Sequence, residues 1–224
     1  MSDYYPIDSY PFDFVDPLSC QPFPMGIVGN IGCGKTFLVQ KIIKMWKYKF
    51  DIIVWISPTY ALQDSSMIKD KTGIVVFDEF TKENITIIKQ HQEQRNRERR
   101  DNGEAPSRML LILDDNGTKT RKLLEGGVMD DILIKSRHYK INTIQLAQRY
   151  TQLSPTLRSN SKFLIFFAEH NPLERINLYK FHGFGDKRDF LQTIDKKTTE
   201  KYSWIGLKCY PDCYRFFTID GYLQ

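Results

Sequence analysis

The chain has 224 residues, of which 41% are hydrophobic and 26% charged, the composition of an ordinary soluble globular protein. This length suffices for one domain with a well-buried core and a small appendage. The 32 Lys and Arg residues against 27 Asp and Glu give a net charge of +5, a mild basic excess that suits a polyanionic partner. The longest clearly apolar run, residues 163–168, is too short to cross a bilayer, so we expect no membrane insertion.

The N-terminal region differs from the rest of the chain. Residues 1–24 contain five prolines and several aromatics, which predicts an extended arm. The first 16 residues are acidic and lack a basic region, so no secretory signal is expected. The four cysteines lack zinc-ligand spacing and histidine partners, which favours reduced thiols in an intracellular setting. We therefore expect an arm over 1–24, one domain over 25–200 and a C-terminal extension of that domain over 201–224.

A phosphate-binding loop follows the arm. Residues 29–36 read GNIGCGKT, the pattern G-x-x-x-x-G-K-[ST], in which glycines let successive backbone N–H groups curl around phosphate oxygens. A short apolar strand, 25–28, enters the loop, and residues 36–43 have apolar side chains at helical spacing. The positive end of this helix faces the phosphates. The loop predicts binding of a nucleoside triphosphate through Gly29, Asn30, Ile31, Gly32, Cys33, Gly34, Lys35, Thr36 and the following Phe37.

Two residues of this loop have specific roles in that chemistry. Lys35 reaches the β- and γ-phosphates, and the Thr36 hydroxyl is a ligand for Mg²⁺. The expected cofactors are therefore ATP and Mg²⁺.

The remaining elements alternate between strands and helices. Continuous apolar runs predict buried strands, and a polar stretch predicts a helix from about residue 82 to 100, followed by a surface loop. The predicted strands are 51–57, 73–77, 109–113, 141–146 and 163–167. This order indicates an α/β fold with a mostly parallel sheet between two helical layers, the RecA-like (ASCE) architecture of phosphate-loop NTPases. Segments 202–205, 206–210 and 214–219 predict a terminal antiparallel hairpin that extends the sheet.

Two of these strands end in paired carboxylates. One pair is Asp114 and Asp115, and the other is Asp78 and Glu79. We favour Asp114 as the Mg²⁺ carboxylate and Asp115 as the residue that orients the attacking water, and we expect their strand beside that of the phosphate loop. Aspartate is one methylene shorter than glutamate, so another residue can share the second task. The alternative for Asp78 and Glu79 is a strand end that begins a helix.

An amide follows the strand 141–146. Gln148 lies at its tip, where a side-chain amide can sense the γ-phosphate or hold the attacking water. Gln145 falls within the apolar run and is the weaker candidate. Either glutamine can instead be an ordinary polar residue that bonds to backbone or water.

With these residues in place, the chain resembles the viral genome-packaging ATPases of the FtsK–HerA superfamily, in particular the poxvirus-type branch of large DNA viruses. Four blocks carry the resemblance in order over roughly residues 25–167: GNIGCGKT, LLILDD, SRHYKINTIQLAQ and YTQLSPTLRSNSKFLIFF. The resemblance implies an ATPase that translocates double-stranded DNA into a capsid. It also implies a homo-oligomeric ring, a pentamer or hexamer, that meets capsid or portal vertex proteins at a host cytoplasmic assembly site or in the virion.

The resemblance also implies residue roles. Lys35 and Thr36 bind phosphates and magnesium, Asp114 holds the metal and Gln148 is the sensor amide. Arg158, in the loop after that strand, is the arginine finger offered to a neighbouring subunit, with Arg149 and Arg137 as weaker candidates. The alternative for Arg158 is a surface cation paired with a carboxylate. Asp115 departs from the family, because many members have glutamate there, which leaves the identity of the catalytic base open.

Basic residues after the acidic pair suggest a DNA contact. Lys119, Arg121 and Lys122 follow the metal carboxylate closely, so hydrolysis there can move a basic loop against DNA phosphates. A second cluster, Arg95, Arg97, Arg99 and Arg100, alternates with Glu93 and Glu98, which favours a solvated helix face.

Two other functions compete with DNA translocation. A nucleotide or nucleoside kinase requires an arginine-rich lid and an acceptor pocket, and an assembly factor binds nucleic acid and uses ATP only as a structural ligand. A GTPase is disfavoured, because no N-K-x-D or T-K-x-D stretch is present.

Overall fold

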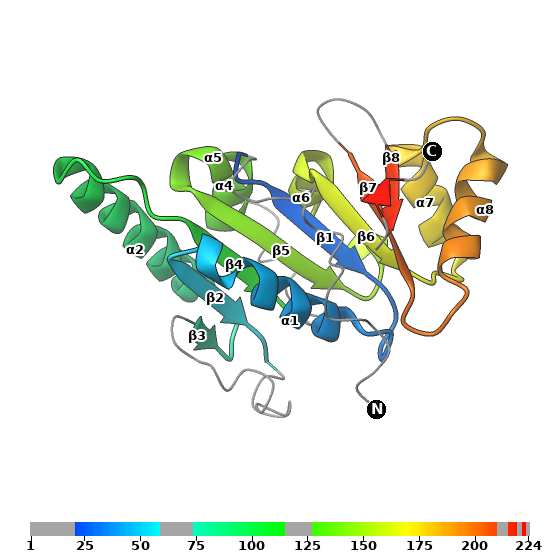
Figure 1. Ribbon diagram of the computed structural model, residues 1–224, viewed down its shortest axis with the longest axis horizontal. Coiled ribbons are helices and arrows are strands. Elements are labelled where there is room, and N and C mark those ends of the chain that lie inside the picture. The colour runs from blue at the N-terminus through cyan, green and yellow to red at the C-terminus, as the bar shows by residue number, and fades with distance from the viewer. Residues whose placement is uncertain (1–20, 59–73, 115–126, 210–214, 219–220, 223–224) are drawn as a thin grey trace.

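One continuous sheet organises the protein. The computed structural model describes residues 21–58, 74–114, 127–209, 215–218 and 221–222. Within these ranges nine strands form a single sheet in the order β3-β2-β4-β5-β1-β6-β7-β8-β9 (Figure 1). Their bounds are β1 Pro24–Val28, β2 Ile52–Ile56, β3 Ile74–Phe77, β4 Met109–Leu113, β5 Ile141–Ala147, β6 Phe163–Phe167, β7 Trp204–Lys208, β8 Arg215–Thr218 and β9 Gly221–Tyr222.

The first six strands are parallel and the last three antiparallel. All five neighbouring pairs from β3 to β6 are parallel, whereas β6-β7, β7-β8 and β8-β9 are antiparallel. Strands β1, β4 and β6 are buried at every position, as expected for apolar strands covered on both faces. The edge strand β3 is only partly buried, so the prediction that every apolar run forms a buried strand is wrong for β3.

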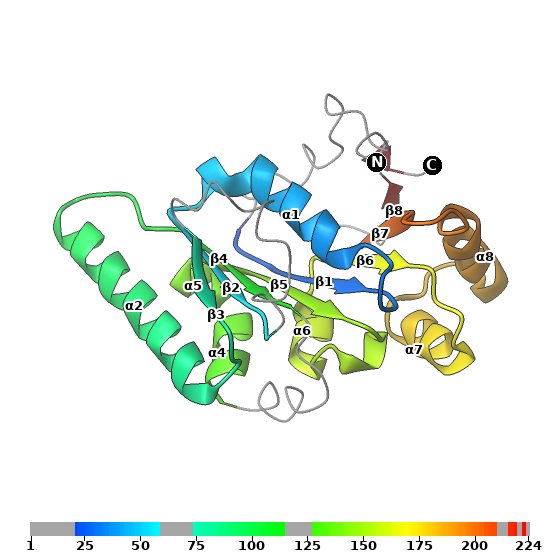
Figure 2. The same cartoon turned by 90° about the horizontal axis from the view of Figure 1, so that it is seen from below.

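Helices cover both faces of the sheet. Helix α1 (Lys35–Trp46) and the short η2 (Lys47–Lys49) lie on one side, and the other helices lie on the opposite side or at the β7 end (Figure 2). These are α2 (Lys82–Asp101), α4 (Val128–Ile134), α5 (Ser136–Tyr139), η5 (Tyr150–Gln152), α6 (Pro155–Asn160), α7 (Pro172–His182) and α8 (Lys187–Lys197). The predicted three-layer α/β architecture is confirmed.

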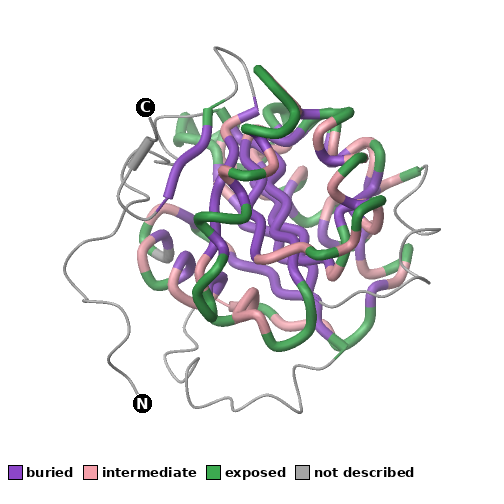
Figure 3. The backbone as a smooth tube through the Cα atoms, turned by 90° about the vertical axis from the view of Figure 1, so that its right-hand side faces the viewer, coloured by how far each residue is buried: buried purple, intermediate pink, exposed green. Residues whose placement is uncertain are grey.

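Two hydrophobic cores follow from this layering. Alternate side chains of each strand point to opposite faces, so the sheet separates a core beneath α1 from a core beneath α2, α4, α6, α7 and α8. Buried strands fill the centre of the molecule, and exposed positions gather on the helices and loops around them (Figure 3). Each large apolar side chain buried in this way contributes about 1.5–3 kcal/mol.

The described parts of the predicted arm and of the predicted tail both contribute to this sheet. The ring of Phe23 packs edge-on against Phe163 with centroids 5.2 Å apart, and Pro24 already belongs to β1. In the tail, the separate segments expected over 202–205 and 206–210 are wrong, because Trp204–Lys208 is one strand. The predicted hairpin is confirmed as β7-β8, and it extends the sheet from β6. Residues 1–20 lie outside the described ranges.

Candidate nucleotide-binding site

The phosphate loop connects the end of β1 to the start of α1. Gly32 and Gly34 have φ angles of 76° and 102°, in the left-handed region that favours glycine. A Cβ atom at Gly29 would lie 2.6 Å from the Sγ atom of Cys33 and 2.7 Å from the Cβ atom of Phe167, closer than packed atoms approach. The backbone conformation therefore favours glycine at positions 32 and 34, and the close side-chain packing favours it at position 29.

The Lys35 side chain folds back over this loop. Its Nζ atom donates hydrogen bonds to the carbonyl oxygens of Gly29 at 2.6 Å and Asn30 at 2.9 Å. A β- or γ-phosphate at this place offers charged acceptors, which bind an ammonium group more strongly than neutral carbonyls do. Burial raises the pKa of the Cys33 thiol more than the nearby Lys35 lowers it, so the thiol stays neutral.

The first turn of α1 leaves the positive end of the helix uncompensated. This turn contains no acidic residue, and the helix begins with Lys35, Thr36 and Phe37 as the motif predicts. The Leu38 N–H donates to the Gly34 carbonyl at 2.9 Å, which starts the helical hydrogen bonding directly at the loop. The N–H groups before it have no acceptor within the helix and suit an anionic ligand.

Asp114 lies at the same edge of the sheet. It follows β4, is only 2% exposed, and its backbone N–H donates to the Ile56 carbonyl at 2.9 Å. The expected neighbouring position of its strand is wrong, because β5 lies between β4 and β1. Two strands of a parallel sheet joined by crossover helices need not be adjacent, and the carboxyl ends of β1, β4 and β5 still meet at one edge. Asp115 lies outside the described residues, as do Lys119, Arg121 and Lys122.

The competing acidic pair is far from the loop. Asp78 and Glu79 follow the edge strand β3, and three strands separate β3 from β1. Both side chains are exposed. The Thr81 side chain accepts a hydrogen bond from the Asn84 N–H at 3.1 Å and caps α2. The geometry thus supports the alternative for Asp78 and Glu79, in which the end of β3 leads into the start of α2.

Gln148 directly follows the strand that touches the loop. The Ala147 carbonyl accepts the Gly29 N–H at 3.1 Å, which joins the tip of β5 to the first loop residue. The backbone N–H groups of Gln148 and Arg149 both donate to the Oε1 atom of Gln152, at 3.0 and 3.1 Å. These bonds hold the Gln148 backbone at the edge of the sheet that carries the loop.

Gln145, the weaker candidate, lies on the face of β5 opposite α1. It is buried, and Ala147, two residues on and on the same face of β5, belongs to the core on the side opposite α1. Its Oε1 atom has no hydrogen-bond partner among the described residues. Alternation along β5 therefore places its side chain away from the helix that starts at the loop.

Arg158 lies in a helix and not in the expected loop. It belongs to the last turn of α6, where its guanidinium carbon is 5.2 Å from the centroid of the Tyr150 ring and 5.3 Å from that of Phe181. Within the described part of the chain it therefore stacks on aromatic rings instead of pairing with a carboxylate. Arg149 and Arg137 are exposed.

Helix α7 carries one buried carboxylate, Glu174, that the sequence did not single out. Glu174 is 6% exposed and accepts hydrogen bonds from the Thr151 N–H at 2.9 Å and the Thr151 hydroxyl at 2.6 Å. No local sequence motif predicts the contact between Glu174 and Thr151, because the two residues lie 23 positions apart.

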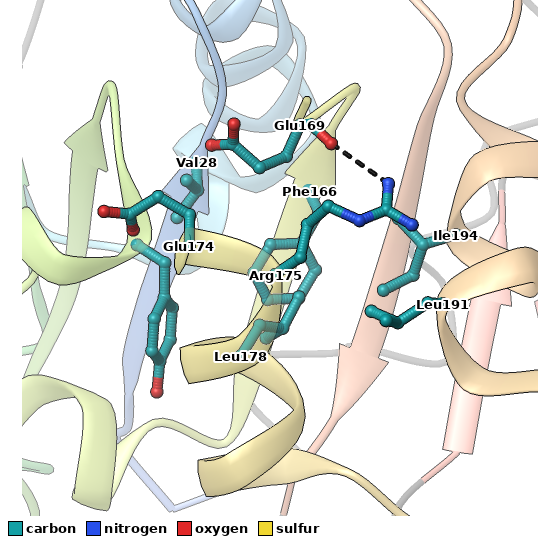
Figure 4. A pocket seen from close by; sticks show the side chains of 9 residues that line it. Val28, Phe166, Glu169, Glu174, Arg175, Leu178, Leu191 and Ile194 are labelled. Carbon is teal, nitrogen blue, oxygen red and sulfur yellow. Dashed lines mark hydrogen bonds between the residues drawn. The ribbon is translucent and has the colours of Figure 1, made fainter. Parts of the chain in front are cut away.

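A small pocket lies beside these groups, between Val28, Phe166, α7 and α8 (Figure 4). There Arg175 donates to the Glu169 carbonyl at 3.2 Å and forms two bonds to Asp195, at 2.5 and 2.8 Å. Arg175 keeps the pKa of the Asp195 carboxyl below its ordinary value. The apolar lining of this pocket belongs to the core on the side of the sheet opposite α1.

The basic cluster of α2 is a mixed-charge face. Arg99 pairs with Asp51 at 2.7 Å and lies 3.7 Å from Glu104, and Arg95 donates to the Ser107 hydroxyl at 3.1 Å. Such contacts support the solvated-face interpretation over a DNA-binding surface.

The described residues contain no preassembled cluster of metal-ligating side chains. No group of three or more His, Cys, Asp or Glu gathers within these ranges. Thr36 and Asp114 nevertheless suit a nucleotide-bound Mg²⁺, since this ion takes few protein oxygens and completes its shell with phosphates and water. None of the helices in the described ranges combines the length and apolarity needed to cross a membrane.

Comparisons with known proteins agree with this fold. The chain is 24% identical over 180 residues to uncharacterized protein 075L of Invertebrate iridescent virus 6, covering 79% of this chain and 67% of that protein. The fold is similar to that of the genome packaging NTPase B204 from Sulfolobus turreted icosahedral virus 2 in complex with ATP-gammaS. The TM-score is 0.65 at 17% identity, over 88% of this chain and 96% of that chain.

A second fold neighbour is the pCW3 conjugation coupling protein TcpA with ATPgS, with a TM-score of 0.56 at 14% identity over 92% of this chain and 60% of that chain. Residues 12–203 match the family model described as Poxvirus A32 protein. This match confirms the resemblance that the four sequence blocks indicate. The chain belongs to the Poxvirus A32 protein family.

Proposed function

We propose that this protein is an ATPase that uses hydrolysis to translocate double-stranded DNA and package a viral genome into a capsid. The observation that carries the proposal is the meeting of three elements at one sheet edge, in a chain of this family: the phosphate loop with Lys35, the buried Asp114 after β4, and Gln148 after β5. The fold likeness to a genome packaging NTPase in complexes with ATP-gammaS, AMPPCP and AMP supports adenine nucleotide as the ligand.

The loop residues hold the triphosphate. Lys35 binds the β- and γ-phosphates, and the backbone N–H groups at the start of α1 bind phosphate oxygens. Thr36 and Asp114 would hold Mg²⁺, which neutralises charge on the phosphates when bound. Asp115 and Gln148 orient the water that attacks the γ-phosphorus in line with the leaving oxygen.

Arg158 acts in trans in this proposal. It belongs to the helical layer opposite α1, so it is offered to the ATP of a neighbouring copy and not to its own loop. A guanidinium supplied in this way offsets the charge of the transition state and is worth about 10³–10⁵ in rate. Turnover then requires a homo-oligomeric ring, and Lys119, Arg121 and Lys122 contact the DNA phosphates in its channel.

Phosphate release measured with and without duplex DNA tests the proposal, together with the mass of the protein in the presence of an ATP analogue and DNA. A DNA-stimulated ATPase that assembles into a ring supports it. Turnover that needs a nucleoside acceptor and ignores DNA identifies a kinase. Nucleotide binding without phosphate release identifies an assembly factor.

Variants locate the activity at the proposed residues. Lys35→Ala should abolish nucleotide binding, with Lys44→Ala, an exposed lysine on the same helix, as control. Asp114→Asn should stop turnover, whereas Asp78→Asn should not. Arg158→Ala should retain binding and lose turnover.

A separate set of variants tests the DNA contact. Alanine at Lys119, Arg121 and Lys122 should weaken DNA affinity and flatten its salt dependence while ATP binding is spared. Alanine at the exposed Arg97 and Arg100 should leave both unchanged. Equal DNA affinity for wild type and the triple variant would reject this contact.

A further inference from the structure

An aromatic side chain lies against the phosphate loop from a distant part of the sequence. Tyr202 belongs to a tight turn in which the Ser203 N–H donates to the Glu200 carbonyl at 3.1 Å, and the Ser203 hydroxyl donates to the same carbonyl at 2.6 Å. Its φ angle is 68°, at a turn position that ordinarily takes glycine or asparagine. A bulky residue held in this region is an outlier, and such outliers concentrate at functional sites.

The Tyr202 ring touches the end of the loop. A Cβ atom built at Gly34 would lie 3.3 Å from the Cδ1 atom of Tyr202. The side chain is nevertheless 44% exposed, so much of the ring is open to solvent. The Lys201 ammonium lies over the ring, 4.8 Å from its centroid. The ring therefore offers an accessible π surface directly beside the residues that bind phosphates.

The order of the strands decides which end of a bound nucleotide this surface meets. Asp114 and Gln148 follow β4 and β5, on one side of β1, so the γ-phosphate points to that side. The base must then lie on the other side of β1, above β6 and β7. Trp204 begins β7 and pairs with Phe167 at the end of β6, which places Tyr202 at that side of the loop.

From these contacts we infer that Tyr202 is the stacking platform for the base of the nucleotide; this inference rests on the proposed function of the phosphate loop. The base covers the ring and displaces the Lys201 ammonium that lies over it. Stacking uses the π face of the base and not its hydrogen-bonding edge. The site therefore accepts ATP and GTP similarly and binds pyrimidine nucleotides less tightly, because they cover less of the ring.

Titrations with ATP-gammaS and with inorganic tripolyphosphate test this inference, since only the first ligand carries a base. Tyr202→Ala should weaken ATP-gammaS binding about 5- to 150-fold, the range of base–aromatic stacking, and leave tripolyphosphate binding unchanged. Tyr202→Phe keeps the ring and should bind like wild type. Tyr48→Ala, at an exposed tyrosine beyond the far end of α1, is the matched control.

A glycine variant separates stacking from backbone strain. Tyr202→Gly removes the ring and relieves the positive φ angle, so it should be at least as stable as Tyr202→Ala in thermal unfolding and still lose ATP-gammaS affinity. Equal ATP-gammaS affinity in wild type and Tyr202→Ala overturns the inference. So does an equal loss for both ligands, because Tyr202 would then support the loop and not the base. Wild-type protein that binds neither ligand overturns the proposed function as well.

Discussion

The tie between α7 and the segment after β5 makes a quantitative prediction. Glu174 is buried and accepts two hydrogen bonds from Thr151, at 2.9 and 2.6 Å. Thr151 belongs to η5, and the last residue of η5, Gln152, accepts the backbone N–H of Gln148 at 3.0 Å. We expect Glu174→Ala to destabilise the protein and to loosen the backbone that positions Gln148.

The size of the effect follows from these contacts. A hydrogen bond to a charged acceptor contributes about 1.5–3 kcal/mol, but water can reach the partly exposed Thr151 after the carboxylate is removed. We therefore expect a loss of about 2–3 kcal/mol in unfolding free energy. At about 2–4 °C per kcal/mol for a chain of this size, the melting temperature falls by about 5–10 °C. Turnover should fall about 10- to 100-fold with little change in binding, because a misplacement of about 1 Å can cost 100-fold in rate.

A double-mutant cycle with Thr151→Ala isolates the contact, measured by urea denaturation and by phosphate release. Glu174 also lies in the first turn of α7, where its charge favours the helix by about 0.3–1 kcal/mol whether or not Thr151 is present. The cycle removes that contribution and should leave a coupling of about 1 kcal/mol. Glu174→Gln keeps an acceptor oxygen and should be intermediate. Stability changes that add within about 0.5 kcal/mol would refute the reasoning.

Three further predictions concern the loop, the acid limit and the tail. Gly34→Ala places a side chain at a φ of 102° and should lower the unfolding free energy by about 1–2 kcal/mol. The variant should also lose most of its affinity for an ATP analogue, measured by titration. Unchanged affinity would contradict the assigned loop geometry. Burial, and then the charge of Arg158, lower the pKa of His182 to about 4, so the unfolded state takes up a proton first as the pH falls. The contribution of neutral His182 to the unfolding free energy should therefore be complete above about pH 6.5, and the unfolding free energy should fall by about 3 kcal/mol toward pH 4. His182→Phe should flatten this dependence, measured by urea titrations at a series of pH values. An equally steep profile in the variant would assign the loss to other groups. Gly206→Ala would place a Cβ atom 2.0 Å from the buried ring of Phe217 and should destabilise the β7-β8 hairpin by about 3 kcal/mol. A thermal unfolding temperature equal to that of wild type would contradict this prediction and show that the ring moves aside freely.

Local patterns in the sequence determined most of the elements. The strands Met109–Leu113 and Phe163–Phe167 have the predicted bounds, because short continuous apolar runs have few other ways to be buried. The phosphate loop was equally readable, since its glycines meet a backbone requirement within eight residues of sequence. The position of Asp114 at the end of such a strand was also predicted, and its role as a Mg²⁺ ligand stays a proposal.

Only the tertiary structure decided how these pieces meet. The order of strands depends on pairing between segments far apart in the chain, so the insertion of β5 between β1 and β4 has no local signal. The same holds for Arg158 on its aromatic rings and for Glu174 against Thr151. It also holds for Tyr202, which lies beside Gly34 of the loop although the two are far apart in the sequence. A sequence specifies local conformation through the residues next to one another, whereas side chains from different elements come together only once the sheet has assembled and buried its two faces.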